Sequence, residues 1–334
     1  MEAHLEDWAA PSVENTASRI AGSYRIPARF DARGEPARLL LQRRRPQPGA
    51  VSNIIRDRPE RIVMPSSLFD LTNKVAVVSG AAQGMGRAMS IALAEAGADL
   101  LLVDLNEAGV RQTAASITAL GRRAGFAVHN VSEPEQVRAL FQRLDADFGR
   151  IDFLGNVAGE SIMGAPEEIS LEDVEQVWRN LVLGRFCACQ EAGRRMLAAG
   201  RGSIVNIGSL ASVTALGRGH IAYSMAMGAV AQMTRELSTE WSGHGVRVNA
   251  ILPAQVLNPG LEKRIAESPR LRDQFLSGIP AGRFGHPDDI KGLAVLLASD
   301  ASQWITGALI PMDGGNLALN GGGSVRHRRE NVTA

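Results

Sequence analysis

The fold of this chain is decided by residues 75–86, which read VAVVSGAAQGMG. The apolar run predicts a short buried strand, and the glycines after it predict a tight turn into a helix that begins near Met85. Gly80 permits the reversal, Gly84 lets a ligand approach the backbone, and Gly86 lets the helix pack closely on the strand. Exposed amide groups at such a helix start attract a pyrophosphate, so the stretch predicts a dinucleotide site. An ordinary loop is the alternative, which the flanking strand and helix disfavour.

Short apolar runs alternate with amphipathic helices along the rest of the chain. We expect strands at 75–79, 99–103, 124–128, 151–155, 202–207, 246–251 and 307–311. We expect helices at 85–97, 107–120, 133–148, 171–199, 223–242, 260–277 and 287–299. This alternation is typical of a parallel sheet covered on both faces. Right-handed crossovers then predict a single α/β domain with a doubly wound, seven-stranded Rossmann fold, whose ligand crevice lies beyond the carboxyl ends of the strands.

The beginning of the chain differs from the rest. Residues 1–63 are rich in proline and arginine, and the run RRRPQPG at 43–49 cannot lie inside a helix or strand. We therefore expect a disordered extension over 1–63, the Rossmann-fold domain over 64–320 and a flexible tail over 321–334. A functional arm at the N-terminus and a translation start at Met64 are the alternatives.

Composition narrows the class of protein. The 334 residues are 45% hydrophobic and carry a formal net charge of +1, which gives no reason to expect nucleic acid or an acidic membrane as partner. Cys187 and Cys189 lie two apart on a predicted helix, where their side chains diverge, so we expect no disulfide and a reducing compartment. We find no signal peptide, no apolar run near the roughly 20 residues of a membrane span, and no metal site. A cytoplasmic protein with a small-molecule partner is expected.

A carboxylate closes the second predicted strand. Asp104 can accept hydrogen bonds from both hydroxyls of an adenosine ribose, and it would repel a 2′-phosphate. The loop from Gly80 to Gly84 contains no arginine. Both features favour NAD over NADP as the cofactor. Asp104 and Glu107 also fit a helix-capping box, an alternative that does not exclude the cofactor role.

Further motifs follow in a fixed order. NVAG at 156–159 comes after the fourth strand, Ser209 after the fifth, and Tyr223 opens a long helix, while MDGG at 312–315 comes near the end. Together with the glycine turn they resemble the short-chain dehydrogenase/reductase family, over about residues 68–320. The resemblance implies hydride transfer between a nicotinamide and an alcohol or ketone.

The resemblance assigns roles residue by residue. Tyr223 matches the proton donor and acceptor, Ser209 the hydroxyl that holds the substrate oxygen, and Asn180 the residue that holds a proton-relay water. Asn130 stands where the family usually has an aspartate that meets the adenine amino group, and its amide oxygen can still accept there. The cofactor-binding residues are then Gly80, Gln83, Gly84, Met85, Gly86, Asp104, Asn130, Val131, Asn156, Ala158, Gly159, Tyr223, Pro253 and Val256.

Each of these residues has a plainer interpretation when it is taken singly. A Tyr at a helix start packs, a Ser after a strand caps, and a buried Asn satisfies the backbone. Their joint order in one fold favours an active site.

The chain departs from the family pattern at Met227, where the family has Lys. Val157 and Ala254 also replace an Asn and a Gly, but they do not touch the mechanism. A Lys one helical turn after Tyr223 would reach the ribose hydroxyls and place a positive charge near the phenol. A phenol titrates near 10, so only about one in a thousand is ionised at neutral pH without such help. We therefore expect alcohol oxidation to be slower by about 10² to 10³, and ketone reduction to suffer less.

Two functions remain open from the sequence. The first is an NAD-dependent oxidoreductase, slow or biased toward reduction. The second is a non-catalytic member that binds dinucleotide as a partner subunit or sensor. The nearest basic residues in sequence, Arg218 and His220, fall in the loop before the helix and are disfavoured as replacements for the lysine. Met225, Met227 and Met233 could form a pocket wall or simply the helix core.

The loops that would meet a substrate are polar and contain few aromatic residues. They offer Glu160, Ser161, Ser212, Arg218, His220, Gln255 and Asn258, a set that favours a sugar, sugar acid or polyol. Residues 257–285 surround a short predicted helix with proline and glycine, and we interpret them as a mobile lid. The resemblance implies a homodimer or homotetramer formed through the helices at 171–199 and 223–242.

Overall fold

The computed structural model describes residues 66–319, and their seven strands form one parallel sheet in the order β3-β2-β1-β4-β5-β6-β7. The strands are β1 Val75–Ser79, β2 Asp99–Asp104, β3 Ala124–Val128, β4 Phe153–Asn156, β5 Gly202–Ile207, β6 Val246–Pro253 and β7 Leu309–Met312. The predicted fold class is therefore confirmed. The chain leaves β1 in one direction for β2 and β3, then returns to the other side of β1 for β4. Such a reversal opens a crevice at the carboxyl ends of the strands.

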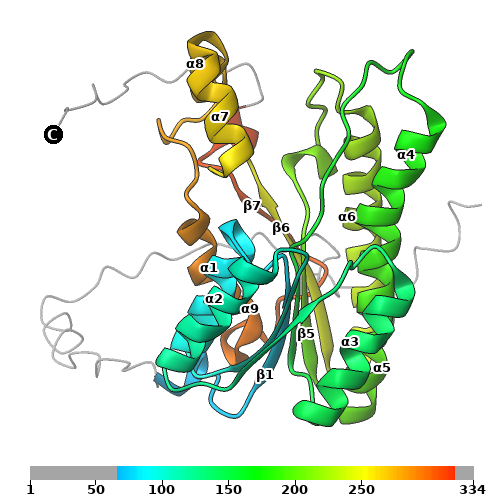
Figure 1. The fold of residues 1–334 in the computed structure, drawn as a ribbon, viewed down its shortest axis with the longest axis vertical. Coiled ribbons are helices and arrows are strands. Elements are labelled where there is room, and N and C mark those ends of the chain that lie inside the picture. The colour runs from blue at the N-terminus through cyan, green and yellow to red at the C-terminus, as the bar shows by residue number, and fades with distance from the viewer. Residues whose placement is uncertain (1–65, 320–334) are drawn as a thin grey trace, which may run out of the picture. The chain divides into compact units, whose positions relative to one another are not determined.

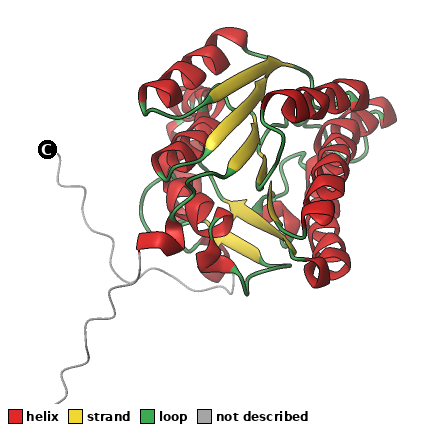
Figure 2. Ribbon diagram, turned by 90° about the horizontal axis from the view of Figure 1, so that it is seen from below, coloured by secondary structure: helices red, strands yellow, loops and turns green. Residues whose placement is uncertain are grey.

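Helices cover both faces of the sheet, as Figures 1 and 2 show. The helices are α1 Gly84–Glu95, α2 Glu107–Ala119, α3 Pro134–Asp147, α4 Leu171–Trp178, α5 Gly184–Ala199, α6 Ile221–Trp241, α7 Pro259–Glu267, α8 Pro269–Ser277, α9 Lys291–Ala298 and α10 Asn316–Leu319. In Figure 1, α1, α2 and α9 lie on one side of the sheet and α3 to α6 on the other.

The alternation of side chains along each strand divides the core into two layers. Val78 and Leu102 pack with α1 and α9, whereas Val77 and Leu101 pack with α3, α5 and α6. All four are at most 1% exposed. Strands buried on both faces read as nearly continuous apolar runs, which is why their positions could be predicted within two residues.

Two long helices that the sequence predicted as continuous are divided in the structure. The expected helix 260–277 ends at Ser268, whose backbone is extended (φ −137°) and whose hydroxyl accepts a hydrogen bond from the Leu271 amide to begin α8. Pro269 provides no amide hydrogen for the preceding helix, so the chain restarts there. The expected helix 171–199 is interrupted by a π-helical turn, η3, at Arg179–Leu183. The helix expected at 287–299 begins as a 3-10 turn at Pro287–Ile290.

Several expectations fall on other parts of the chain. The extension over 1–63, the start at Met64 and the tail over 321–334 lie outside the described residues. Cys187 and Cys189 are both buried and free, as expected. Within residues 66–319, no helix combines the length and apolar character needed to cross a bilayer.

Candidate active site

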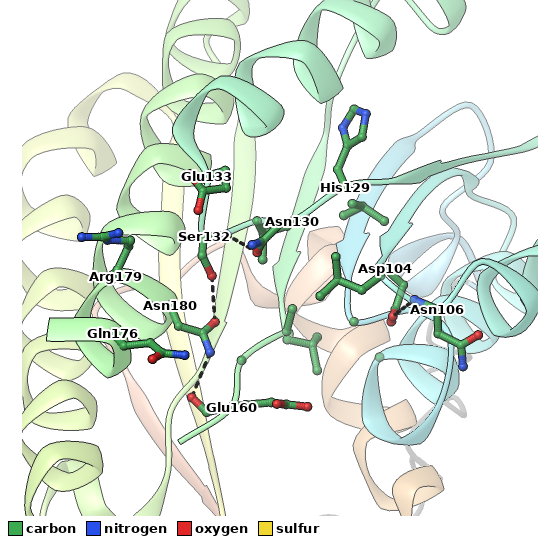
Figure 3. A pocket seen from close by; sticks show the side chains of 18 of the residues that line it. Asp104, Asn106, His129, Asn130, Ser132, Glu133, Glu160, Gln176, Arg179 and Asn180 are labelled. Atoms are coloured by element: carbon green, nitrogen blue, oxygen red, sulfur yellow. Dashed lines mark hydrogen bonds between the residues drawn. The ribbon is translucent and has the colours of Figure 1, made fainter. Parts of the chain in front are cut away.

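A cavity of about 850 Å³ opens at the carboxyl ends of the central strands. Its wall comes from the glycine turn after β1, the end of β2, the loops after β3 and β4, and the turn η3 (Figure 3). Among the predicted site residues, those that line it are Gly80, Gln83, Met85, Gly86, Asp104, Asn130, Val131, Ala158, Gly159 and Asn180. Residues far apart in sequence thus meet at the point where the strand order reverses.

The glycine turn has the geometry that a dinucleotide needs. Gly80 and Gly84 have φ of 67° and 55°, a region that disfavours other residues. A Cβ on Gly86 would lie 2.1 Å from the Gly80 carbonyl oxygen, whereas nothing lies within 4 Å of one built on Gly84. Gln83, at the N-cap of α1, makes no side-chain capping bond, so its side chain does not occupy the first amides of the helix. The turn therefore fits a pyrophosphate.

Asp104 is fixed by two backbone amides. Its Oδ2 accepts from Ala82 at 2.9 Å and its Oδ1 from Asn106 at 2.9 Å. The cap of α2 is Asn106, whose Oδ1 accepts from the Gly109 amide at 3.0 Å, so the alternative of a capping box at Asp104 is wrong. Because Asn106 caps the helix, the Asp104 side chain is not needed as a cap, and it lines the cavity. Each of its carboxylate oxygens keeps capacity for a further donor.

A string of hydrogen bonds crosses the cavity wall from the loop after β3 to the loop after β4. The Ser132 amide donates to Asn130 Oδ1 at 3.0 Å, and the Ser132 hydroxyl donates to Asn180 Oδ1 at 3.1 Å (Figure 3). Asn180 Nδ2 then donates to the Glu160 carbonyl at 2.9 Å. Ser132 was not predicted, and only its position after a strand could have suggested it.

The remaining predicted residues lie outside the lining of this cavity: Gly84, Asn156, Ser209, Tyr223, Pro253 and Val256. Asn156 is 3% exposed and its Nδ2 donates to Asn206 Oδ1 at 3.0 Å. It therefore joins β4 to β5 beneath the wall. The wall itself is held by Ser79, whose hydroxyl oxygen accepts from the amides of Val157 and Ala158 at 3.0 and 3.1 Å.

Ser209 lies two residues after the end of β5, and Tyr223 lies in the first turn of α6. The Ser209 oxygen accepts from the Ala211 amide at 3.1 Å, which leaves its hydroxyl hydrogen for another acceptor. The Tyr223 ring packs on the apolar cluster of α6 and meets the His220 ring edge-on, with centroids 6.2 Å apart. Ser209 thus caps a short turn and can still bind a substrate oxygen.

Met227 belongs to the helix core. It is 1% exposed and packs with Leu181, Ala226 and Val230. The basic residues near Tyr223 in sequence do not take the place of a lysine here. Arg218 lies over the Phe275 ring, 4.8 Å from its centroid, and His220 Nδ1 lies 2.7 Å from the Gly217 carbonyl oxygen.

One buried cation escaped the sequence analysis. Arg185 is 5% exposed and lies on α5, where it donates to the carbonyl oxygens of Ala158, at 3.1 Å, and Ile207. Burial lowers the pKa of its guanidinium to about 10, while interactions with Tyr223 and Cys189 act in the opposite direction. The missed signal was an arginine at a position of the helix stripe that is otherwise apolar.

A doubly wound sheet, a glycine turn and an acidic residue at the end of β2 define a dinucleotide-binding protein. A family model described as enoyl-(acyl carrier protein) reductase matches residues 80–316. The chain is 42% identical over 248 residues to a D-threitol dehydrogenase of Mycolicibacterium smegmatis, covering 74% of this chain and 94% of that one. It is 36% identical over 247 residues to an NAD-dependent glycerol dehydrogenase of Listeria innocua, covering 74% and 95%.

The solved structures agree with these relatives. The crystal structure of a gluconate 5-dehydrogenase from Burkholderia cenocepacia, in complex with NADP and tartrate, is similar with a TM-score of 0.71 and 31% identity, covering 76% of this chain and 98% of that one. The chain belongs to the short-chain dehydrogenase/reductase family, and the predictions of this family and of an oxidoreductase are confirmed.

Proposed function

We propose that this protein is an NAD-dependent dehydrogenase that interconverts an alcohol and a ketone on a polyol or sugar acid. The observation that carries the proposal is the fixed carboxylate of Asp104 in the same cavity as the open backbone of the glycine turn. An amide-rich turn suits a pyrophosphate, and a carboxylate at the end of β2 suits a ribose with both hydroxyls free.

The residues divide the chemistry among them. A bound nicotinamide supplies the acceptor or donor of the hydride. The Ser209 hydroxyl donates to the substrate oxygen, and the Tyr223 oxygen takes the proton of the substrate hydroxyl during oxidation or returns it during reduction. Asn180 lies in the cavity wall and, as the resemblance implies, holds a water that connects this proton to solvent.

The substrate class is supported by the relatives, which are named for D-threitol and glycerol, and by the polar loops. Two of the residues in those loops have other roles in the structure. Arg218 stacks on Phe275, and Asn258 caps α7. Glu160 lines the cavity, whereas Gln255 lines a separate hollow together with Arg283 and Asp289. The Glu160 carboxylate is therefore the side chain of this set that can meet a substrate hydroxyl group in the cavity.

The test is an assay of hydride exchange on purified full-length protein. The panel contains threitol, glycerol, galactitol and gluconate, with either dinucleotide. Turnover of at least one of them, faster with NAD than with NADP, is expected. A second function is favoured by the apolar burial of Met227, namely a member that binds dinucleotide without turnover. This binding function is supported if calorimetry shows that NAD binds while no substrate of the panel is turned over.

Assembly is part of the same proposal. Leu183 and Phe186 on the segment from η3 to α5 are 54% and 39% exposed, and Met225 on α6 is 46% exposed. Apolar side chains exposed on these helices suit a homodimer or homotetramer. Light scattering over a range of protein concentrations tests this, and a monomer at every concentration would contradict it.

Cofactor choice gives a prediction at one residue. Asp104→Asn removes the negative charge that faces the ribose, and we expect the ratio of NADP affinity to NAD affinity to rise about ten- to a hundredfold. The reason is that repulsion of a 2′-phosphate disappears and charge-assisted hydrogen bonds to the ribose hydroxyls weaken. Isothermal calorimetry with both dinucleotides measures the ratio. Glu133→Gln is the matched control, because Glu133 also lines the cavity and loses the same charge. An equal effect in both variants would refute a specific role for Asp104.

A further inference from the structure

We propose that Arg185 supplies, from a different helix, the positive charge that the family places at position 227, and that it acts on the proton held by Tyr223. This inference rests on the proposed function. Arg185 is then a positioning residue for charge: it exchanges no proton itself and acts through the Tyr223 oxygen.

The turn η3 brings Arg185 to the sheet. The Gly184 amide donates to the Arg179 carbonyl and so closes a turn of five residues, which winds more loosely than an α-helix. Residues four apart therefore stay on one face of the helical segment through the turn. Val177, Leu181 and Arg185 are such residues. All three are buried. Farther along α5 the same buried face carries Cys189, Ala192 and Met196.

The two carbonyls that hold the guanidinium place it where β4 and β5 end. Ala158 belongs to the cavity wall, and Ile207 ends β5 two residues before Ser209. A Cβ built on Gly159 would lie 3.1 Å from Arg185 Nη2. The guanidinium therefore lies where the loop after β4 meets the loop after β5, between the cofactor wall and the proposed catalytic serine.

In the part of the chain that the structure describes, the charge of Arg185 has no partner of opposite sign. Within residues 66–319 it forms no ion pair, and its buried Nε makes no hydrogen bond. Even at the lowered pKa of about 10, the guanidinium is protonated at neutral pH. Burying a lone cation is costly, and an anion formed beside it recovers part of that cost. A phenolate at Tyr223 is such an anion.

The other groups near this charge do not compete with Tyr223. Burial raises the pKa of the Cys189 thiol to about 12, so it stays neutral. His220, which directly precedes α6, meets the Tyr223 ring edge-on, and its Nδ1 lies 2.7 Å from the Gly217 carbonyl oxygen. Met227 carries no charge. Among residues 66–319, Arg185 is thus the cation that interacts with Tyr223 at neutral pH.

The test uses the fact that the chain has two tyrosines, Tyr24 and Tyr223. Full-length protein labelled with carbon-13 at the phenol carbon gives two signals by NMR, and Tyr24→Phe assigns them. The protein is titrated without cofactor or substrate. In Arg185→Met we expect the midpoint of the Tyr223 signal to lie at least about one pH unit above that of the parent. In Arg185→Lys it should stay within about half a unit, because the charge is kept.

Two further variants separate charge from structure. Arg185→Met with Met227→Lys should bring the midpoint back toward that of the parent, because the cation returns from the family's usual position. Arg185→Gln keeps donors for the two carbonyls and loses the charge, so it should behave like Arg185→Met and replaces it if that variant does not fold. His220→Gln should leave the midpoint unchanged.

The proposal is overturned if folded Arg185→Gln or Arg185→Met titrates at Tyr223 as the parent does, which would make Arg185 a purely structural anchor of the two loops. In an active parent, the alkaline change of kcat/KM for alcohol oxidation should move with the NMR midpoint. If the midpoint shifts while no substrate is turned over, the charge role stands and the proposed dehydrogenase function fails.

Discussion

Tyr223→Phe is expected to lower kcat/KM for the best substrate by about 10³-fold, because it removes the oxygen that exchanges the proton with the substrate. The ring remains, so its packing on the cluster around Leu181 and Ala226 is kept and the fold should survive. NAD affinity should fall by no more than about tenfold, the value of one lost hydrogen bond. Steady-state kinetics and calorimetry on the same preparation measure both quantities.

The matched control for this variant is Tyr24→Phe, which makes the same chemical change at the only other tyrosine. It should retain the activity of the parent. If Tyr223→Phe also keeps its activity, the proton is exchanged elsewhere and the proposed site is wrong. If both proteins bind NAD but neither they nor the parent reduce or oxidise any substrate, the protein is the binding member of the family.

Gly86→Ala is expected to abolish measurable dinucleotide binding and to lower the free energy of unfolding by about 3 kcal/mol. A Cβ there would lie 2.1 Å from the Gly80 carbonyl oxygen and 3.0 Å from that of Ser79. Both obstacles are backbone atoms, which cannot rotate away as a side chain can. The start of α1 would have to move away from β1, and the amides that face the pyrophosphate would move with it.

Urea unfolding and calorimetry with NAD check this expectation. Gly292→Ala is the control, because Gly292 lies in α9, its φ is not positive and nothing lies within 4 Å of a Cβ built there. That variant should be as stable as the parent or slightly more so, since alanine favours helix. Normal binding by Gly86→Ala would mean that the turn holds no phosphate.

The strands and the glycine turn could be predicted because their signals are local. A strand buried on both faces must be apolar along its whole length, and the reversal at Gly80 requires a positive φ that glycine tolerates. The breaks in the helices were harder to predict. Ser268 and Pro269 lie next to each other in sequence and could have been recognised as an end and a start, whereas no local pattern marks the π turn at Arg179–Leu183.

The candidate site was predicted in part for the same reason. Asp104 ends β2 and Ala158 follows β4, and the carboxyl ends of parallel strands meet at one edge, so their presence in one cavity follows from the order of elements. The capping alternative at Asp104 was wrong because the neighbouring Asn106 takes that role. Asn156 instead bonds Asn206 across two strands, a pairing set by the register of β4 against β5.

The sequence by itself determined the family, the doubly wound sheet and the absence of a lysine at position 227, because each is written in residue type and order. Only the tertiary structure decided where the charge near Tyr223 is. Arg185 lies 38 residues before Tyr223 in the chain, yet it meets the same site because η3 turns it toward the sheet and the ends of β4 and β5 supply its two acceptors. Burial and charge contacts of this kind arise from packing between distant elements, which no local pattern of residues encodes.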